Sequence, residues 1–389
     1  MLAIKTPLRY INELRKILME REIIARNYKI LTENRYGYIP IKEKINNETL
    51  EKIKKELTII LNNSLKYNLE NNLKTISIEN LDIQIIEKNL EEVKKQPTSI
   101  SEQLKGKLQE KEIEDLKTSF DIIGDIVILE IPENLKDQKQ IIGEAALNFT
   151  KRKSIFMKKS AIEGITRTRQ LEHIAGDKAL ETIHKEHGAR FKLDVSKVYF
   201  SPRLATERKR IAKQVKDKET ILDMFAGIGP FSIIIAKEKN VDITAADINK
   251  SAIEYMEENI KLNKLKGRIT PVLGDVNQIA KEDQKFSNSL NMADEKFQKN
   301  NTKFDRIIMN LPGTAKDFLD LAISLINDEG TIHYYEFSDS YDSGIKRIKK
   351  IAESQNKEVE VLATRKVKSS RPGEWHIVID VKIKHIFFK

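Results

Sequence analysis

The sequence of 389 residues contains no cysteine. Disulfide bonds, thiolate metal sites, iron–sulfur clusters and cysteine nucleophiles are therefore excluded. The absence is compatible with a reducing cytoplasm, where we expect the protein to act. No apolar run approaches the roughly 18 residues that a membrane helix requires. The first residues also lack the pattern of a secretory signal, so we expect neither a membrane partner nor secretion.

Histidine is scarce as well, with six in the chain. His184 and His187 lie three residues apart, but no further acidic or histidine residue completes a metal-binding motif around them. Ordinary surface or core positions explain scattered histidines more simply than metal ligation does. We therefore expect no metal site.

The formal net charge is +10, from 69 Lys and Arg against 59 Asp and Glu. A basic surplus favours a polyanionic partner. However, Lys, Ile and Asn are all abundant, which points to a compositional bias as a second explanation. Basic residues gather at 151–153, 158–159, 209–210, 346–350 and 365–371. Each cluster alone is an ordinary solvated patch, but together they could flank a groove that follows phosphates.

Composition and periodicity predict three domains, at residues 1–100, 101–196 and 197–389. The first combines a helix through Leu14 and Leu18, a hairpin around 34–37 and polar helices at about 50–66 and 88–95. A polar stretch at 94–119 reads as a linker or a solvated helix. The second domain begins with an apolar strand at 121–132, and a helix follows at 138–153. Both smaller domains are therefore predicted to be α+β.

From Val198 onward, strands alternate regularly with helices, which predicts an α/β fold with helices on both faces of a parallel sheet. Two late strand-like runs, at 358–367 and 374–383, have no helix between them. They predict an antiparallel hairpin at one edge of the sheet. Residues 280–303 interrupt the alternation, and their polar composition predicts a mobile surface insertion.

The strongest chemical signal is Asp223-Met-Phe-Ala-Gly-Ile-Gly229, between a predicted strand and a predicted helix. Gly227 and Gly229 would let the backbone approach a ligand closely at the carboxyl edge of the sheet. This is not the dinucleotide-binding GxGxxG pattern, because Ser232 stands at the third glycine position. A glycine-rich turn alone is weak evidence, since tight strand–helix turns need glycine anyway.

Three further residues at strand ends strengthen this signal. Asp247 ends the next strand, where a carboxylate can accept from both ribose hydroxyls of a nucleoside. Asp275 ends the third strand, within reach of an adenine amine, and Asn310 ends the fourth. Any one of them could be a plain helix cap or turn former. The ordered set resembles the class I S-adenosylmethionine-dependent methyltransferases, over about residues 200–390.

The sequence also restricts which atom would be methylated. Pyrimidine C5 methylation uses a cysteine nucleophile, which this chain lacks. Enzymes that methylate exocyclic amines carry Asn/Asp-Pro-Pro-aromatic motifs, and the Asn310-Leu-Pro-Gly313 segment has no aromatic residue. A ring nitrogen such as guanine N1 remains, and its weakly acidic proton calls for a general base and for positive charge near O6.

Two upstream segments supply candidates for these roles. Pro202 can start a helix, which places Arg203 and Glu207 four residues apart on one face. A surface ion pair between these two is the simpler interpretation from spacing alone. Arg167 and Arg169 lie in a second cluster that ends at His173, which by itself is only a basic loop.

Several segments together resemble the archaeal and eukaryotic tRNA (guanine-37 N1)-methyltransferase family. They are VYFSPRLATERKRI (198–211), DMFAGIGPFSI (223–233), DIN (247–249), IKLNKL (260–265), IMNLPG (308–313) and HYYEF (333–337). RTRQLEHIAG (167–176) and TIHKEHG (182–188) resemble the family's middle domain, and the amino-terminal hairpin resembles the extra tRNA-binding domain of the archaeal enzymes. The resemblance implies a Rossmann-like class I methyltransferase domain with a mostly parallel seven-stranded sheet, preceded by two smaller α+β domains.

The resemblance also implies a role for each matched residue. Glu207 would be the general base on guanine N1, and Arg167 would stabilise charge on O6. Asn310 and Pro312 would hold the target base and the methyl donor, with Tyr199 packing nearby. The residues that would bind S-adenosylmethionine are Arg208, near its carboxylate, and Phe225, Gly227, Gly229, Asp247, Ile248, Asp275, Val276 and Asn310.

The implied activity is methyl transfer to N1 of guanosine 37 in the tRNA anticodon loop, by a monomer that also contacts the tRNA body. Two alternatives remain open. One is an aminocarboxypropyl transferase of wyosine tRNA modification that uses the same cofactor. The other is a non-enzymatic RNA-binding protein with a vestigial fold, although no matched strand-end residue is damaged. The insertion at 280–303 departs from the shorter family pattern.

Overall fold

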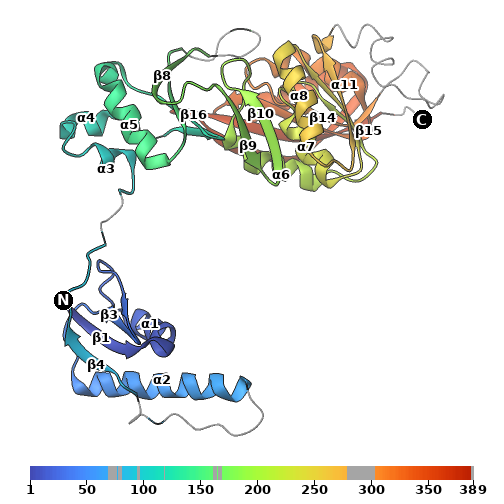
Figure 1. The fold of residues 1–389 in the computed structure, drawn as a ribbon. Coiled ribbons are helices and arrows are strands. Elements are labelled where there is room, and N and C mark those ends of the chain that lie inside the picture. Colours follow the sequence, from blue (N-terminus) through green and yellow to red (C-terminus); the bar gives the residue numbers. More distant parts are fainter. Residues whose placement is uncertain are drawn as a thin grey trace. The chain divides into compact units, whose positions relative to one another are not determined.

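The computed structural model describes residues 1–68, 77, 81–93, 97–117, 119–160, 164, 169–277 and 303–386. Contacts within the chain separate two compact units, Met1–Pro97 and Thr98–Lys389 (Figure 1). Apart from Lys303, the predicted insertion at 280–303 lies outside the described residues. Within those ranges, no helix has the length and apolar character needed to cross a membrane.

The amino-terminal unit packs two helices and a 3-10 turn against a four-stranded antiparallel sheet. The strands lie in the order β2 (Leu31–Glu33), β3 (Tyr36–Pro40), β1 (Leu2–Pro7) and β4 (Gln84–Glu87), and the helical elements are η1 (Leu8–Tyr10), α1 (Ile11–Glu20) and α2 (Asn47–Asn68). The predicted helix through Leu14 and Leu18 is confirmed, since both side chains are buried on α1. The predicted hairpin is confirmed as β2 and β3.

One expectation for this unit is wrong. The helix at 50–66 is confirmed by α2, but 88–93 is not helical. There the backbone pairs with residues 27–29: the Val93 N–H donates to the Asn27 carbonyl at 2.7 Å, and the Lys29 N–H donates to the Glu91 carbonyl at 2.8 Å. These long-range bonds satisfy backbone groups that a helix would have bonded locally, so local propensity was overridden.

The first part of the second unit contains a four-stranded sheet covered by α5 (Lys139–Thr150) and α3 (Ile100–Leu104). Its strands lie in the order β5 (Asp121–Ile123), β6 (Ile126–Leu129), β7 (Ser154–Lys158) and β8 (Leu171–Gly176), with α4 (Glu110–Asp115) and η3 (Glu133–Gln138) outside it. The single strand predicted at 121–132 is wrong: the chain turns at Gly124, where φ is +56°. A Cβ on Gly124 would stand 2.2 Å from the Thr182 hydroxyl, so the turn requires glycine.

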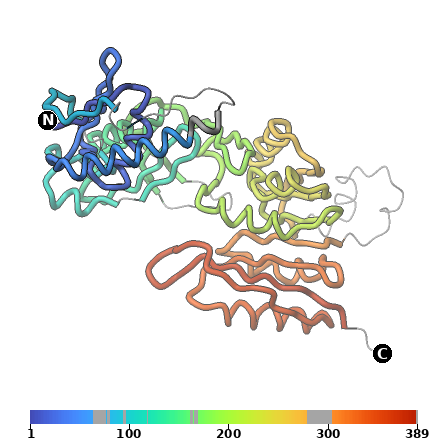
Figure 2. The backbone as a smooth tube through the Cα atoms, turned by 90° about the horizontal axis from the view of Figure 1, so that it is seen from below, coloured from blue at the N-terminus to red at the C-terminus, as the bar shows by residue number. Residues whose placement is uncertain are grey.

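The last part of the chain forms a seven-stranded sheet. Its strands are β11 (Thr220–Asp223), β12 (Asp242–Asp247), β13 (Arg268–Leu273), β14 (Phe304–Met309), β15 (Ile326–Ser338), β16 (Lys357–Arg371) and β17 (Glu374–His385). They lie in the order β13-β12-β11-β14-β15-β17-β16. Pairs among β11–β15 are parallel, whereas β17 is antiparallel to both β15 and β16. The predicted antiparallel edge hairpin is therefore confirmed (Figure 2).

Helices cover both faces of this sheet, as predicted. The core on one face includes residues of α6 (Ala205–Gln214), α7 (Pro230–Glu238) and α8 (Lys250–Leu262). The other core includes residues of η6 (Ala315–Phe318), α11 (Leu319–Leu325) and α12 (Asp342–Ser354), while η4 (Pro202–Leu204) directly precedes α6. Successive strand residues alternate between the two cores, so Tyr334 belongs to the second and Tyr335 to the first.

A two-stranded hairpin of β9 (Glu181–Glu186) and β10 (Ala189–Asp194) packs on α8. The Lys192 N–H donates to Asn259 Oδ1 at 2.6 Å, and Asn259 Nδ2 donates back to the Lys192 carbonyl at 3.1 Å. Asn263 makes the same pair of bonds to Arg190, at 2.9 and 2.8 Å. The two asparagine side chains therefore pair with backbone N–H and C=O groups of β10, as a neighbouring strand would. These contacts cross the predicted domain boundary at 196–197.

Replacing these asparagines should destabilise the second unit to different degrees. Asn259 is fully buried, so Asn259→Ala removes the partners of two part-buried backbone groups of Lys192 at an enclosed position and should cost about 1–3 kcal/mol. Asn263 is only partly buried, so water can replace its side chain and Asn263→Ala should cost less. Urea unfolding of both variants measures the difference, and equal losses would contradict the assigned role of Asn259.

Candidate active site

The turn after β11 brings backbone to the carboxyl edge of the parallel strands. Gly227 and Gly229 have φ of +56° and +81°, in the left-handed region that favours glycine. A Cβ on Gly229 would come within 2.9 Å of Met256 Cγ, whereas a Cβ on Gly227 would meet nothing closer than the Tyr199 carbonyl at 3.8 Å. Gly229 is therefore needed for conformation and packing, while Gly227 leaves open space beside it for a ligand.

Asp247 is held against this turn. One carboxylate oxygen accepts from the Gly227 N–H at 2.7 Å, and the other accepts from the Asn249 N–H at 2.9 Å. Because β11 and β12 are parallel neighbours, their carboxyl ends meet at one edge. The carboxylate is therefore fixed by two backbone donors, and the next side chain, Ile248, is 43% exposed.

The next strand ends also carry predicted site residues. Asp275 follows β13 and accepts from the Asn277 N–H at 2.8 Å, while Val276 is buried in the core. Asn310 follows β14, and its buried Oδ1 accepts no hydrogen bond from the parts of the chain that are described. A buried acceptor without a donor is costly, so Asn310 fits a site that a ligand donor completes. The Phe225 ring meets the Phe318 ring edge-on at a centroid distance of 4.9 Å.

Asp223, at the start of the glycine turn, is a fully buried carboxyl group, which the sequence alone did not indicate. Its side chain is fully buried and accepts from the Ser232 hydroxyl at 2.8 Å. Burial raises the pKa of this carboxyl to about 7, even though the Ser232 bond acts in the opposite direction. The position of Asp223 at the end of β11 could be predicted from the sequence. Its burial could not, because it depends on the packing of α7 against the strand end.

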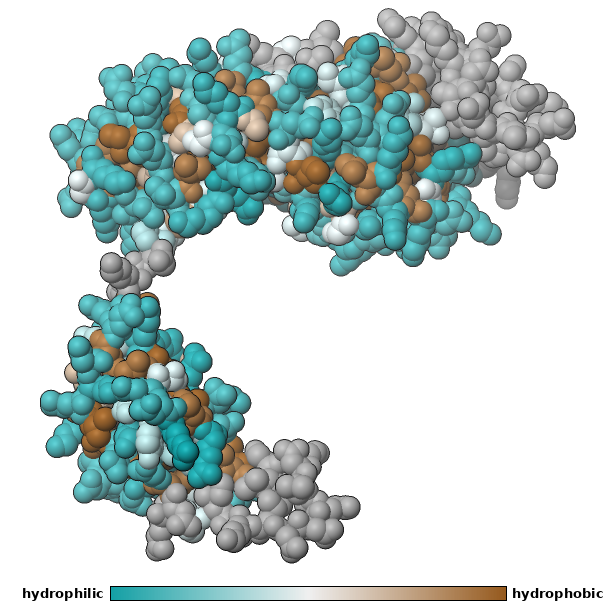
Figure 3. Space-filling view, in the orientation of Figure 1, coloured by the Kyte–Doolittle hydropathy of each residue, from teal (hydrophilic) through white to brown (hydrophobic). Residues whose placement is uncertain are grey.

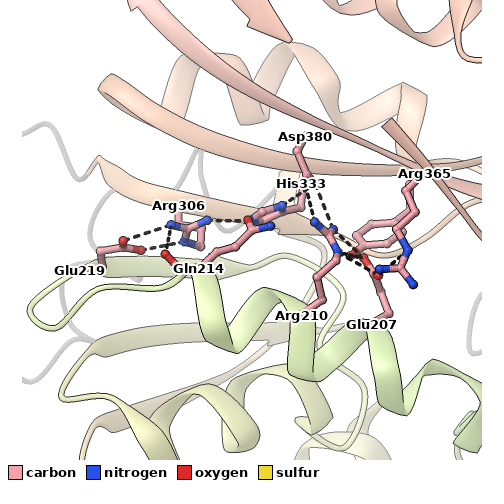
Figure 4. A network of polar contacts seen from close by, with 9 residues as sticks. Glu207, Arg210, Gln214, Glu219, Arg306, His333, Arg365 and Asp380 are labelled. Atoms are coloured by element: carbon pink, nitrogen blue, oxygen red, sulfur yellow. Dashed lines mark hydrogen bonds and ion pairs between the residues drawn. The ribbon is translucent and has the colours of Figure 1, made fainter. Parts of the chain in front are cut away.

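Glu207 lies on α6 and is 1% exposed. Its Oε1 accepts from the Tyr335 hydroxyl at 2.7 Å and from Arg210 Nη2 at 2.7 Å (Figure 4). The expected surface ion pair with Arg203 is wrong: the Arg203 guanidinium pairs with Asp121 of β5 at 2.7 Å. The reason is that Pro202–Leu204 forms a separate 3-10 turn before α6, which directs Arg203 away from Glu207.

Arg208, beside Glu207, points to a different partner. It is 1% exposed and binds Glu186 of β9 with two hydrogen bonds of 2.7 and 2.5 Å. A third bond, at 3.0 Å, reaches the Ser201 carbonyl. Its guanidinium is thus held by the protein itself rather than presented to the predicted cofactor carboxylate, and it fixes the loop that carries Tyr199.

The remaining predicted residues are placed as follows. Tyr199 and Arg169 line a small hollow together with Asp121. Pro312 accepts from the Phe337 N–H at 3.2 Å, which ties the Asn310 loop to β15. Arg167 lies outside the described residues. Among the residues that the structure describes, no three His, Asp or Glu side chains gather closely enough to hold a metal ion.

Several basic residues of the predicted phosphate-binding clusters have internal partners. Lys209 pairs with Glu238, Arg210 with Glu207 and Arg347 with Glu336. In this structure, carboxylates of the same chain hold these three side chains, and the groove that follows phosphates stays a prediction. Hydrophilic residues still cover much of the visible face of each unit (Figure 3). Lys366 lies over the Trp375 ring at 4.5 Å, and that ring packs at the rim of the core.

The strand order, the glycine turn and the carboxylate of Asp247 at one sheet edge define a class I S-adenosylmethionine-dependent methyltransferase. Comparison with known families gives the narrower assignment. The TRM5/TYW2 methyltransferase domain matches residues 182–292 and 285–362, the TYW2 N-terminal domain matches 100–179, and the tRNA methyltransferase 5 N-terminal domain matches 3–50. The chain belongs to the TRM5/TYW2 methyltransferase family.

Individual relatives cover the chain to different extents. It is 40% identical to tRNA (guanine(37)-N(1))-methyltransferase Trm5b of Pyrococcus abyssi, over 98% of this chain and 99% of that protein. It is 35% identical to a tRNA(Phe) (4-demethylwyosine(37)-C(7)) aminocarboxypropyltransferase of Methanocaldococcus jannaschii, over only 68% of this chain and 97% of that protein.

Two solved structures are similar over nearly the whole chain. The complex of aTrm5 with tRNALeu has a TM-score of 0.71 and 35% identity, covering 98% of this chain and 99% of that one. Methanocaldococcus jannaschii Trm5 in complex with adenosine has a TM-score of 0.60 and 34% identity, covering 99% and 100%. Members of the family thus bind tRNA and a nucleoside.

The buried carboxyl of Asp223 should make stability depend on pH. The folded state holds its proton more tightly than the unfolded chain does, so this contribution to stability falls as pH rises from 3.8 to about 7. Asp223→Asn cannot ionise and should remove that part of the slope in thermal unfolding across the window. Asp137→Asn, at an exposed position, is the matched control and should keep it. An unchanged slope in Asp223→Asn would contradict the assignment.

Proposed function

We propose that the protein transfers a methyl group from S-adenosylmethionine to N1 of guanosine 37 in tRNA. The observation that carries the proposal is similarity to a tRNA (guanine(37)-N(1))-methyltransferase over 98% of the chain, both units included. The similarity to an aminocarboxypropyltransferase covers only 68%. The methyl transfer is therefore the better supported of the two reactions.

The residues at the strand edge fit the cofactor. Asp247, oriented by the Gly227 N–H, would accept from the ribose hydroxyls, and Ile248 offers an exposed apolar side chain to the adenine. Phe225, Asp275 and Val276 would line the same site, and Gly229 would fix the turn in which Gly227 leaves space for the ligand. Asn310 would satisfy its buried Oδ1 with a ligand donor. Arg208 supports this site by fixing the Ser201 backbone.

In the reaction, bound S-adenosylmethionine supplies the electrophilic methyl group. Glu207 would take the N1 proton of guanine, so that the N1 lone pair is free to form the new bond. Arg167 would donate to O6, where negative charge develops. Tyr199, Asn310 and Pro312 would hold the base. The target base must reach a carboxylate that is 1% exposed in this structure, so substrate binding has to open access to Glu207.

The remaining parts of the proposal concern partners and division of labour. Residues 1–100 would recognise the tRNA body, 101–196 would help to hold the anticodon loop and 197–389 would catalyse the transfer. The protein would act as a monomer in the cytoplasm.

Product mass is the direct test of this function. The protein is incubated with S-adenosylmethionine and tRNA, and the nucleosides are separated and weighed after digestion. We expect a guanosine heavier by one methyl group, with the modification at N1 of position 37. Transfer of an aminocarboxypropyl group would establish the wyosine alternative instead. The absence of any modified nucleoside, with tRNA binding intact, would favour a non-enzymatic RNA-binding protein.

The base is tested by Glu207→Gln, which keeps shape but cannot take the N1 proton. Single-turnover methyl transfer should slow by roughly 10²–10⁴-fold, the usual range for a lost general base. Higher pH should partly rescue the variant, because hydroxide begins to deprotonate N1. Lys213→Gln, at an exposed position on the same helix, is the control and should keep the wild-type rate. Wild-type transfer by Glu207→Gln would leave Glu207 a purely structural carboxylate.

A further inference from the structure

Glu207 belongs to a continuous chain of polar contacts that runs across strands β17, β15 and β14 (Figure 4). Arg210, one turn further along α6, donates to both Glu207 oxygens at 2.7–3.2 Å. The same guanidinium donates to Asp380 of β17 at 2.5 and 3.2 Å. Arg210 therefore lies between two carboxylates, one of them the proposed base.

The chain continues beyond Asp380. His333 Nδ1 lies 2.7 Å from Asp380 Oδ1, and its Nε2 lies 2.7 Å from Arg306 Nη1. A guanidinium can only donate, so Nε2 of the neutral ring must accept and Nδ1–H must donate to Asp380. Arg306 in turn binds Glu219 at 2.7 and 3.1 Å. Each member thus fixes the direction of the next hydrogen bond.

The protonation states follow from burial and these partners. Burial lowers the pKa of His333, which keeps the ring neutral despite Asp380. Burial alone would raise the pKa of Asp380, but the bonds from His333 and Arg210 hold it well below its usual range. Arg210 loses solvation, yet its two carboxylate partners raise its pKa. Asp380 therefore stays an anion and Arg210 a cation.

Few other groups face Glu207 among the elements described around it. Tyr335 of β15 donates its hydroxyl, and its pKa lies well above the usual value because it is buried beside that carboxylate. The ring of His376 lies 5.4 Å from the Tyr335 ring. Arg365 of β16, which is 41% exposed, places Nε 3.9 Å from Glu207 Oε2. Arg210 is thus the closest cation to the proposed base and the one shared with a second anion.

We propose that Arg210, anchored by Asp380 and His333, is a positioning residue that sets the orientation and the proton affinity of Glu207. The inference rests on Glu207 acting as the base in the proposed function. A cation bound to Glu207 alone would weaken it as a base. Sharing that cation with Asp380 reduces this effect, while two-point binding keeps the carboxylate in one rotamer. The resulting base is held still and remains able to accept a proton.

The proposal predicts opposite effects for the two partners. Arg210→Gln removes the cation that favours the ionised form of Glu207, so the acid limb of the pH–rate profile should move to higher pH. Asp380→Asn leaves Arg210 to Glu207 alone, so the limb should move to lower pH. Each displacement should be about one pH unit, the lower end of the effect of a neighbouring charge. A merely structural role would lower stability without moving the limb.

The measurement is single-turnover methyl transfer to tRNA as a function of pH, on variants shown by circular dichroism to be folded. Arg210→Lys should bring the limb back toward wild type but leave the rate low, because an ammonium cannot reproduce the two-point contact. Arg365→Gln, at a more exposed position, should move the limb upward by less than Arg210→Gln does. Lys213→Gln removes a charge from the same helix outside the network and should leave the limb in place.

The outcomes separate this inference from the proposed function. If wild type makes no N1-methylguanosine, the proposed function is wrong. If wild type is active and Glu207→Gln transfers at the same rate, Glu207 is not the base and Arg210 positions nothing catalytic. If Glu207→Gln is slow but folded Asp380→Asn and Arg210→Gln keep the wild-type limb, or move it in one direction, the inference alone is overturned. If Arg210→Gln does not fold, Asp380→Asn and Arg365→Gln test the inference instead. The acid limb must then move to lower pH in Asp380→Asn and to higher pH in Arg365→Gln, and an unmoved limb overturns the inference.

Discussion

The charges on helix α6 constrain the whole second unit, because Arg208 and the Glu207–Arg210 pair must meet partners on other elements. Glu207 and Arg208 are adjacent and almost fully buried, yet they point to different partners. Glu207 faces the seven-stranded sheet through Tyr335, and Arg208 faces the β9–β10 hairpin through Glu186. An uncompensated buried charge costs several kcal/mol, so α6 can occupy only a position in which both are paired.

This constraint joins the parts of the second unit into one body. Just before α6, Arg203 pairs with Asp121 of the four-stranded sheet. The segment 203–208 therefore contacts the four-stranded sheet, the seven-stranded sheet and the β9–β10 hairpin. The hairpin itself is held on its other side by Asn259 of α8 and by Asn263, the residue after that helix. Tyr199 lies on the loop before α6 that Arg208 holds through the Ser201 carbonyl, and its own carbonyl lies next to the turn of Gly227. The proposed base and the proposed cofactor turn are therefore positioned by a shared set of contacts.

The cofactor side of the site depends on a simpler rule. Parallel strands end at one edge, and the residues after them face the same space. Asp247 and the Gly227 turn use this rule directly, since one hydrogen bond links two strand ends. The wyosine-modifying relatives share this domain, so the strand edge cannot by itself decide which group is transferred. Similarity over the amino-terminal unit is what favours the methyl transfer.

The sequence by itself determined the alternation of strands and helices, the edge hairpin, the glycine turn and the strand-end residues, because all of these follow from periodicity and local backbone requirements. It could not locate residues 88–93, whose hydrogen bonds come from 27–29, or the turn at Gly124, which Thr182 crowds. Spacing on a helix suggested that Glu207 pairs with Arg203. Only the tertiary structure could bring Tyr335 to Glu207 and link Arg210 to Asp380, because partners 128 and 170 residues away leave no local pattern and buried charges select them by packing.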